Sequence, residues 1–375
     1  MKKLNKTLLQ KFDYKLPKDL IAQVPTKPRD AARLLILDKK TNHIDHKYFF
    51  DLGDYLNPGD VLVLNNSKVI PARLLGYKST GGKIEIFLLN KKFPSLPSLP
   101  AGRQGGGQVD VADNFGQPLF NLPLERGENN NIWQVLIKGK VKINQEIIFS
   151  QNIKATIIKK HDDQSWLVKF NSSDKKIFSI GHTPLPPYIK KSAKMSDYQT
   201  IYAQSFGSVA APTAGLHFTK KLLKELKKKG VKIEYITLHV GLGTFLPVKT
   251  KYIEDHKIHS ELAILNPQTA KIINQAKQSG HQIIAVGTTS ARTLEAFSNH
   301  QKLLKPQSKW VNIFIYPGYK FKIIDGLITN FHLPKSTLLM LVSALAGEKN
   351  IKKAYQIAIA QKYKFFSFGD AMLIK

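Results

Sequence analysis

Residues 202–219 read Y-A-Q-S-F-G-S-V-A-A-P-T-A-G-L-H-F-T, and the organisation of the chain can be worked out from this stretch. The stretch passes through a loop of small residues and ends at Thr219, directly before K-K-L-L-K-E-L-K-K-K, whose leucines share one helical face. Thr219 is a residue type preferred at a helix N-cap. Such a loop at a helix N-terminus can bind a polar or anionic group, although it can also be a simple tight connection.

The composition is that of a globular protein with a large excess of positive charge. The chain has 375 residues, 42% of them hydrophobic, and this length suits two domains. A net charge of +30 favours a polyanionic partner such as RNA, but only six of the 57 basic residues are arginine, so part of the charge is solvated lysine surface. In such a chain arginine is kept where a planar guanidinium is needed, and four arginines lie in ordered contexts: Arg29, Arg33, Arg73 and Arg292.

Several classes of protein are disfavoured by what the sequence lacks. There is no cysteine, which excludes disulfides, thiolate nucleophiles and cysteine metal sites. The N-terminal residues include lysines but no apolar segment, so we expect no signal peptide. The apolar run at residues 338–346 is too short to cross a bilayer. These features suit a cytoplasmic protein.

The pattern of expected elements changes near residue 184. Between about 60 and 175 only short strands are predicted, which is typical of a small β-barrel. From residue 200 onward strands alternate with helices, which indicates an α/β domain. In that domain we expect strands at 231–240, 281–286 and 312–316, and helices at 267–280, 290–297 and 335–346, with a short helix also at 17–23. Residues 90–131 have low complexity (P-S-L-P-S-L-P-A-G-R-Q-G-G-G), so we expect a flexible extension there.

Three expected strand ends of the α/β domain carry loops rich in Gly, Thr, Ser and His. They occupy residues 238–245, 286–295 and 327–334. Because ligands of α/β folds bind at the carboxyl ends of strands, these loops and the 202–219 stretch predict one shared pocket. Gly-Leu-Gly at 241–243 is not read as a nucleotide-binding turn, because no helix follows it and Pro247 comes four residues later.

Individual side chains in these loops admit more than one role. G-T-T-S at 287–290 opens a helix and could hold a carboxylate or phosphate, or Ser290 could be an N-cap among bystander threonines. Arg292 could reach an anionic ligand or pair with Glu295.

Titratable residues gather at 255–261 and near the end of the chain. D-H-K-I-H-S-E lacks the spacing of a zinc site, so we interpret His259 and Glu261 as a hydrogen-bonded acid–base pair. Asp370 follows a glycine at an expected strand end and could face a cationic ligand.

Long uninterrupted motifs resemble the S-adenosylmethionine:tRNA ribosyltransferase-isomerase family of the queuosine pathway. They include the 202–219 stretch, L-H-V-G-L-G-T-F-L-P-V, H-K-I-H-S-E, A-V-G-T-T-S-A-R-T-L-E, I-Y-P-G-Y, L-I-T-N-F-H-L-P-K-S-T, F-F-S-F-G-D-A-M, F-D-Y-x-L-P-x-x-L-I-A-Q, R-D-A-A-R-L-L and V-I-P-A-R-L. The resemblance covers almost the whole chain except about 90–131.

The resemblance implies a fold and a reaction. The fold is α/β, a large barrel-like α/β domain (1–58 and 185–375) with a small β-barrel domain inserted (59–184). The reaction transfers the ribosyl part of S-adenosylmethionine to 7-aminomethyl-7-deazaguanine at the tRNA wobble position and isomerises it, giving epoxyqueuosine with release of adenine and methionine. S-adenosylmethionine is consumed as a substrate, so no cofactor and no metal are expected, and the protein would be a cytoplasmic monomer without membrane contact.

The resemblance also implies site residues. The acid–base set would comprise His217, His239, His259, Glu261 and His332. S-adenosylmethionine would contact Thr213, Gly215, Gly241, Gly243, Thr244, Thr288, Thr289, Ser290, Arg292 and Asp370. tRNA would contact Arg33, Lys68, Arg73 and Lys190. The chain departs from the family pattern at Lys68, where Arg is common, and at K-G-K-V-K (138–142), where relatives carry a longer basic segment.

Two other functions remain open at this point. An ordinary S-adenosylmethionine-dependent RNA methyltransferase is disfavoured by the context of the glycines. A non-catalytic RNA-binding protein would show interleaved aromatic and basic residues, whereas the dense motifs here consist of Thr, Gly and His at strand ends.

Overall fold

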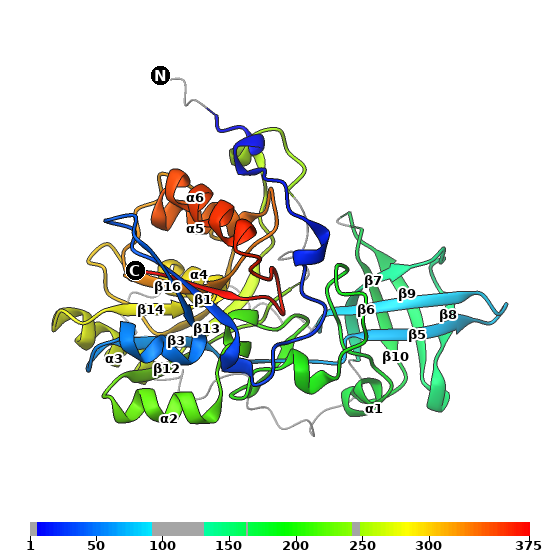
Figure 1. The fold of residues 1–375 in the computed structure, drawn as a ribbon. Coiled ribbons are helices and arrows are strands. Elements are labelled where there is room, and N and C mark those ends of the chain that lie inside the picture. The colour runs from blue at the N-terminus through cyan, green and yellow to red at the C-terminus, as the bar shows by residue number, and fades with distance from the viewer. Residues whose placement is uncertain (1–5, 92–130, 163, 242–247) are drawn as a thin grey trace, which may run out of the picture. The chain divides into compact units, whose positions relative to one another are not determined.

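The computed structural model describes residues 6–91, 131–162, 164–241 and 248–375. The chain forms two compact units, coloured by residue number in Figure 1. Unit 1 comprises Met1–Ile70 and Leu185–Lys375, and unit 2 comprises Pro71–Pro184. Most of the extension expected at 90–131 lies outside the described residues. The predicted fold class is confirmed, because unit 1 contains a mixed α/β sheet and unit 2 a closed β-barrel.

A nine-stranded sheet forms the centre of unit 1. In spatial order its strands are β15 (Gln307–Val311), β13 (Glu261–Leu265), β12 (Lys232–Leu238), β3 (Val61–Asn65), β14 (Ile283–Val286), β16 (Gly326–Asn330), β17 (Ala371–Ile374), β1 (Arg33–Leu37) and β2 (Ile44–Tyr48). The described strands form an open order from β15 to β2, so the barrel-like closure that the resemblance implied for this domain is not found among them.

Four neighbouring strands of this sheet are parallel, namely β12, β3, β14 and β16. Their carboxyl ends therefore lie at one edge of the sheet. β17 runs antiparallel to β16, and β1 runs parallel to β17, so the first residues of β17 and β1 reach this same edge. The loops predicted to share a pocket follow these carboxyl ends.

The two faces of the sheet are covered by different helices because side chains alternate along each strand. Val61 and Val63 of β3 belong to a core shared with the helices α3, α4, α5 and α6, whereas Leu62 and Leu64 face a core shared with α2 and the 3-10 segment Phe49–Tyr55. The helices are α2 (Lys220–Lys228), α3 (Pro267–Gln278), α4 (Thr288–Ala296), α5 (Thr337–Ala346) and α6 (Glu348–Ala360).

The expected domain boundary near residue 59 is wrong. Residues 61–64 were predicted to enter the β-barrel unit, but β3 is a central strand of the large sheet and is buried throughout. After it, β4 (Ser67–Val69) pairs with β11 (Ser205–Ser208), still within unit 1. The chain enters unit 2 only after Ile70. A run of four apolar residues marks a buried strand but does not reveal which sheet it joins.

Unit 2 is a closed six-stranded barrel. Its strands, in spatial order, are β10 (Trp166–Phe170), β7 (Ile132–Lys138), β6 (Lys83–Lys91), β5 (Arg73–Lys78), β8 (Glu146–Ile148) and β9 (Lys154–Lys160), and β9 pairs with β10 to close it. Ile84, Ile86 and Leu88 alternate along β6 and are all buried, as a barrel interior requires. A short helix, α1 (Asp174–Ser179), follows the last strand.

Three smaller expectations are corrected. The strand expected at 312–316 lies instead at Gln307–Val311, where β15 pairs with β13. The helix expected at 17–23 is a 3-10 turn, Lys18–Leu20. Asp370 precedes β17 and so lies at the start of a strand, not at its end.

Thr219 caps α2, as predicted, and we expect its hydroxyl to contribute to stability. Its Oγ1 accepts from the Leu222 N–H at 3.1 Å and donates to Asp30 Oδ2 at 2.6 Å. Thr219→Ala should lower the free energy of unfolding by about 1–2 kcal/mol, because an N-cap bond and a long-range bond are both lost. Urea denaturation measures this loss. Thr219→Ser keeps the hydroxyl and should retain most of the stability; equal losses in both variants would contradict the assignment.

Candidate active site

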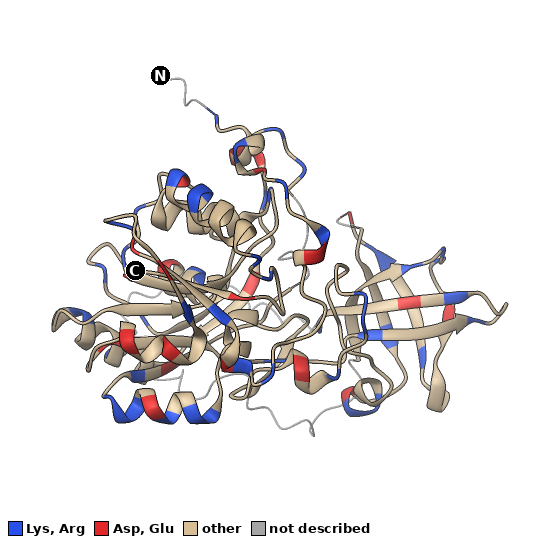
Figure 2. Ribbon diagram, viewed as in Figure 1, with Lys and Arg blue, Asp and Glu red and all other residues tan. Residues whose placement is uncertain are grey.

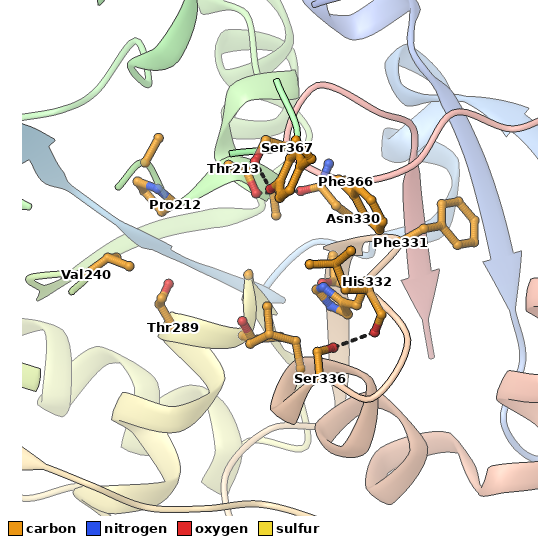
Figure 3. Close-up of a pocket in the computed structure, with 18 residues that line it drawn as sticks. Pro212, Thr213, Val240, Thr289, Asn330, Phe331, His332, Ser336, Phe366 and Ser367 are labelled. Atoms are coloured by element: carbon orange, nitrogen blue, oxygen red, sulfur yellow. Dashed lines mark hydrogen bonds between the residues drawn. The ribbon is translucent and has the colours of Figure 1, made fainter. Parts of the chain in front are cut away.

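A cavity lies at the edge of the sheet where the parallel strands end (Figure 3). Its walls come from residues 211–214, from Val240 beyond β12, from the start of α4, from the segment after β16, and from residues 366–367. Its volume is about 70 Å³. Pockets for whole organic ligands measure roughly 300–1,000 Å³, so this cavity can hold one part of such a ligand.

Four of the predicted site residues line this cavity, namely Thr213, Thr288, Thr289 and His332. They come from three separated segments, two of which are predicted strand-end loops. The third predicted loop contributes Val240. Gly243 and Thr244, which were also predicted, lie outside the described residues.

Asn330 connects two walls of the site and was not singled out from the sequence. It ends β16 and is 3% exposed. Thr213 donates from Oγ1 to Asn330 Oδ1 at 3.0 Å, and Asn330 Nδ2 lies 3.2 Å from His217 Nε2. Because the amide nitrogen can only donate, His217 Nε2 accepts and its proton is assigned to Nδ1. The signal for Asn330 was its place in T-N-F-H at a strand end.

His217 is buried behind the cavity rather than in its lining. Its ring lies 4.9 Å from the ring of Phe49, centroid to centroid. Burial lowers the pKa of His217 to about 4, opposed by a hydrogen bond with the Arg29 backbone. The imidazole is therefore neutral near pH 7, and it orients Asn330.

His332 lines the cavity itself and is held on several sides. Its Nε2 lies 2.8 Å from Thr329 Oγ1, and its backbone N–H donates to Tyr355 Oη at 2.9 Å. Tyr14 donates to its backbone carbonyl. Burial lowers the pKa of His332 to about 3. The imidazole of His332, like that of His217, is therefore neutral near pH 7.

His239 is placed by a close approach of the backbone. Burial lowers its pKa to about 4. A Cβ added to Gly207, whose φ is +136°, would come within 2.7 Å of His239 Nδ1, so glycine is required there. His239 is not part of the cavity lining.

The start of α4 faces the cavity with Thr288 and Thr289. Asn65 fixes this helix end: its Nδ2 donates to Thr289 Oγ1 at 3.3 Å and to the Leu238 carbonyl at 2.9 Å, while its Oδ1 accepts from Leu238 N and Ser67 N. First-turn N–H groups of a helix have no intrahelical acceptor, so this wall favours an anionic group.

Glu261 is paired with Arg292, not with His259. Arg292 Nη1 donates to Glu261 Oε2 at 2.5 Å, and the Gly241 N–H donates to Oε1 at 2.9 Å. His259 is exposed, and in the described part of the chain no hydrogen bond joins it to Glu261. The predicted acid–base pair is therefore corrected to a buried ion pair that also holds Gly241, next to the cavity residue Val240.

Arg292 and Glu295 do not form the local pair considered above. Glu295 is 2% exposed, and its carboxylate accepts from Tyr319 Oη and from the N–H groups of Lys322, Ile323 and Ile324. Arg292 also donates from Nε to the Ile313 carbonyl at 3.2 Å. The predicted contact of Arg292 with a ligand competes with these internal bonds.

Five of the predicted ligand contacts are not among the lining residues, namely Gly215, Gly241, Ser290, Arg292 and Asp370. The Asp370 carboxylate accepts from the backbone N–H groups of Arg33 and Lys364 at 2.8 and 2.7 Å, so it anchors the start of β17. A Cβ at Gly215 would meet Tyr202 Oη at 1.9 Å, which shows that this glycine is needed for packing.

The cavity lining also contains a phenol that the sequence did not indicate. Tyr188, in the stretch P-L-P-P-Y-I-K at 184–190, lines the cavity, and its hydroxyl lies 2.7 Å from Ser367 Oγ. Burial raises the pKa of Tyr188 to about 12, so the phenol is neutral. The composition of this proline-rich stretch gives no sign of such a role.

The four predicted tRNA contacts have different surroundings. Arg33 lies 3.7 Å from the centre of the Tyr363 ring, and Arg73 binds Glu85 with two hydrogen bonds of 2.7 and 3.2 Å inside unit 2. Lys190 is exposed, and Lys68 lies over the ring of Phe206. In Figure 2 the ribbon is blue at lysine and arginine positions, which occur in both units and repeatedly along α2.

Within the described residues, no group of three or more His, Cys, Asp or Glu side chains is arranged to hold a metal ion. None of the described helices combines the length and apolar character that crossing a bilayer requires.

The fold and the site define an α/β enzyme whose cavity, at the carboxyl edge of its sheet, presents threonine, asparagine and histidine side chains between apolar ones. Comparisons with known proteins identify its family. The family model described as queuosine biosynthesis protein matches residues 9–374. The chain belongs to this family and is an enzyme of the transferase and isomerase kind. It is 47% identical over 372 residues to a protein of Clostridium kluyveri named S-adenosylmethionine:tRNA ribosyltransferase-isomerase, covering 97% of this chain and 98% of the relative.

Two further relatives agree. A protein of Acetivibrio thermocellus with the same name is 48% identical over 97% of this chain and 98% of its own length. The crystal structure of the S-adenosylmethionine tRNA ribosyltransferase of Thermotoga maritima is similar with a TM-score of 0.52 and 36% identity, covering 97% of this chain and all of that chain.

The buried histidines should make stability fall in weak acid. Their pKa values, about 4 for His217 and His239 and about 3 for His332, lie below the unfolded value of about 6.5. The unfolded state then binds protons first, so stability is present above about pH 6.5 and is lost as the pH falls. Between about pH 6.5 and 5, the free energy of unfolding should fall by up to about 1.4 kcal/mol per pH unit for each histidine. Carboxyl groups ordinarily titrate at lower pH, so they contribute little to this slope.

Urea denaturation at several pH values measures this slope. His332→Gln removes one titrating group and should flatten the slope by up to about 1.4 kcal/mol per pH unit, even if it lowers stability at pH 7. If the free energy of unfolding of the variant depends on pH as steeply as that of the original protein, then His332 has the same pKa in the folded and unfolded states.

The ion pair of Glu261 and Arg292 should be costly to break from one side. Both side chains are at most 7% exposed. Glu261→Gln leaves a buried guanidinium without its counter-charge and should lower the free energy of unfolding by about 3–5 kcal/mol. Combining Glu261→Gln with Arg292→Met should recover part of this loss in urea denaturation. A double variant with the summed loss of both single variants would contradict the coupling.

Proposed function

We propose that this enzyme transfers the ribosyl part of S-adenosylmethionine to 7-aminomethyl-7-deazaguanine at the wobble position of tRNA. The transferred group isomerises to an epoxycyclopentanediol, giving epoxyqueuosine, while adenine and methionine leave. The observation that carries this proposal is the 47% identity, over 97% of the chain, to a relative named for this activity. The net charge of +30 fits a tRNA substrate.

The cavity would hold part of S-adenosylmethionine. The N-terminus of α4, with Thr288 and Thr289, suits the methionine carboxylate because its N–H groups and hydroxyls can donate to an anion. Thr213, fixed by Asn330, could bind a further polar group of the ligand. S-adenosylmethionine would be consumed, and the proposal requires neither a cofactor nor a metal.

His332 is the proposed base. The reaction requires removal of a proton from the ribose 5′ carbon beside the sulfonium, and the base must be unprotonated beforehand. Among the described lining residues, the titratable side chains are His332 and Tyr188, and the pKa of His332 lies near 3. An anionic group bound beside the imidazole would raise that pKa and strengthen the base. His217 and His239 would position the site, and the exposed His259 is not included.

Product analysis tests the function. The purified protein is incubated with S-adenosylmethionine and an anticodon stem-loop that carries 7-aminomethyl-7-deazaguanine, and products are followed by mass spectrometry. Free adenine and methionine with a matching mass gain on the RNA are expected. S-adenosylhomocysteine would instead reveal methyl transfer and refute the proposal, as would tight RNA binding without turnover.

A matched pair of variants tests the base. His332→Gln should lower kcat by about 10²–10⁴-fold, as expected for loss of a general base. His300→Gln changes an exposed histidine of the same unit and should leave kcat unchanged. Full turnover by His332→Gln would remove His332 from the mechanism.

A further inference from the structure

An aromatic side chain stands in solvent on the small sheet formed by β4 and β11. Phe206 is 54% exposed, although a phenylalanine ring gains free energy from burial. Lys68 is its register partner on β4, and its Nζ lies 4.3 Å from the centre of the ring. A cation above an exposed ring is only weakly held, so Lys68 can leave it for a stronger charged partner.

The backbone sets this position of Phe206. The pairing of β11 with β4 shifts between Phe206 and Ser208, and Gly207 between them has φ +136°. Bulges of this kind re-aim a side chain and occur next to active sites. The same glycine accommodates the ring of His239, since a Cβ there would lie 2.7 Å from Nδ1. One constraint thus fixes both the exposed ring and a buried site histidine.

The small sheet leads directly into the cavity wall. Ser208 Oγ accepts from the Val240 N–H at 2.9 Å and donates to Ser67 Oγ at 2.8 Å. Val240 and Ala211 both line the cavity. Phe206 precedes Ala211 by five residues, which span at most about 17 Å of extended chain. The ring therefore lies within a few nucleotide lengths of the cavity.

The charge near the ring suits a polyanion. The paired segments read S-K-V and S-F-G-S, with flanking Asn66 and Gln204, and contain one basic and no acidic residue. Bases of single-stranded RNA stack on exposed aromatic rings, and lysine binds the phosphates that follow.

We propose that Phe206 and Lys68 form a stacking site for an unpaired nucleobase of the anticodon loop, close to the base being modified. Phe206 receives the base and Lys68 contacts an adjoining phosphate. This inference rests on the proposed function, because that function supplies the RNA.

Binding of the anticodon stem-loop to the full-length protein, followed by fluorescence anisotropy, tests the site. Phe206→Ala should raise the Kd roughly 5- to 100-fold, as expected for the loss of one base–aromatic stack. Phe206→Trp keeps a ring and should bind within about twofold of the original protein. Lys68→Ala should weaken binding and reduce the slope of log K against log salt by about one.

Two controls separate stacking from general damage. Trp310→Ala removes another exposed aromatic, 56% exposed on the edge strand β15, and should not change the Kd. Stem-loops that each lack one base of the loop identify the stacked base. Removing that base should raise the Kd for the original protein as much as Phe206→Ala raises it for the intact loop. Combining the two changes should raise the Kd no further.

The outcomes distinguish this inference from the function on which it rests. The original protein could bind and modify the stem-loop while Phe206→Ala, like the control Trp310→Ala, leaves the Kd unchanged. In that case the stacking site is wrong and the proposed function stands. If the original protein neither binds nor modifies it, the proposed function fails, and the stacking site fails with it.

Discussion

The edge of the sheet that carries the site depends on one fully buried amide. Asn65 ends β3 with no exposed surface, and its side chain makes four hydrogen bonds, which is the full capacity of an amide. These bonds join β3 to Leu238 of β12, to Thr289 of α4 and to Ser67 at the start of β4. Parallel strands bring their carboxyl ends together, but the amide fixes the distances between them. The cavity lies beside this join, which ties the ends of β3 and β12 to the start of α4.

Burial then decides the charge state of the site. The imidazoles of His217, His239 and His332 are neutral because charging them inside the protein would cost more than in water. The charge that is buried here, on Arg292, is compensated by Glu261. A neutral site with an electropositive helix end suits a ligand that brings both a cation and a carboxylate. It also leaves proton transfers to groups whose pKa values change when that ligand binds.

Local features could be predicted from the sequence, and long-range partners could not. The cap at Thr219, the start of α4 and the convergence of strand-end loops depend on neighbouring residues and on the general behaviour of parallel strands. Asp370 and Glu261 each have a distant partner, Arg33 at 337 residues and Arg292 at 31 residues along the chain. Sequence proximity suggested His259 for Glu261 instead. Helix α6 was missed although its buried residues follow helical spacing, because no motif drew attention to it.

The different uses of arginine and lysine bear on how RNA would be recognised. The arginines in ordered contexts use their guanidinium groups within the protein: Arg29 on two backbone carbonyls, Arg33 on Tyr363, Arg73 on Glu85 and Arg292 on Glu261. The charge left for a polyanion is then mainly lysine, which attracts phosphates as a point charge and reads no sequence. Such attraction weakens steeply with salt and does not distinguish one tRNA from another. Under the proposed function, selection of the substrate would then depend on contacts with bases, such as the stack proposed for Phe206.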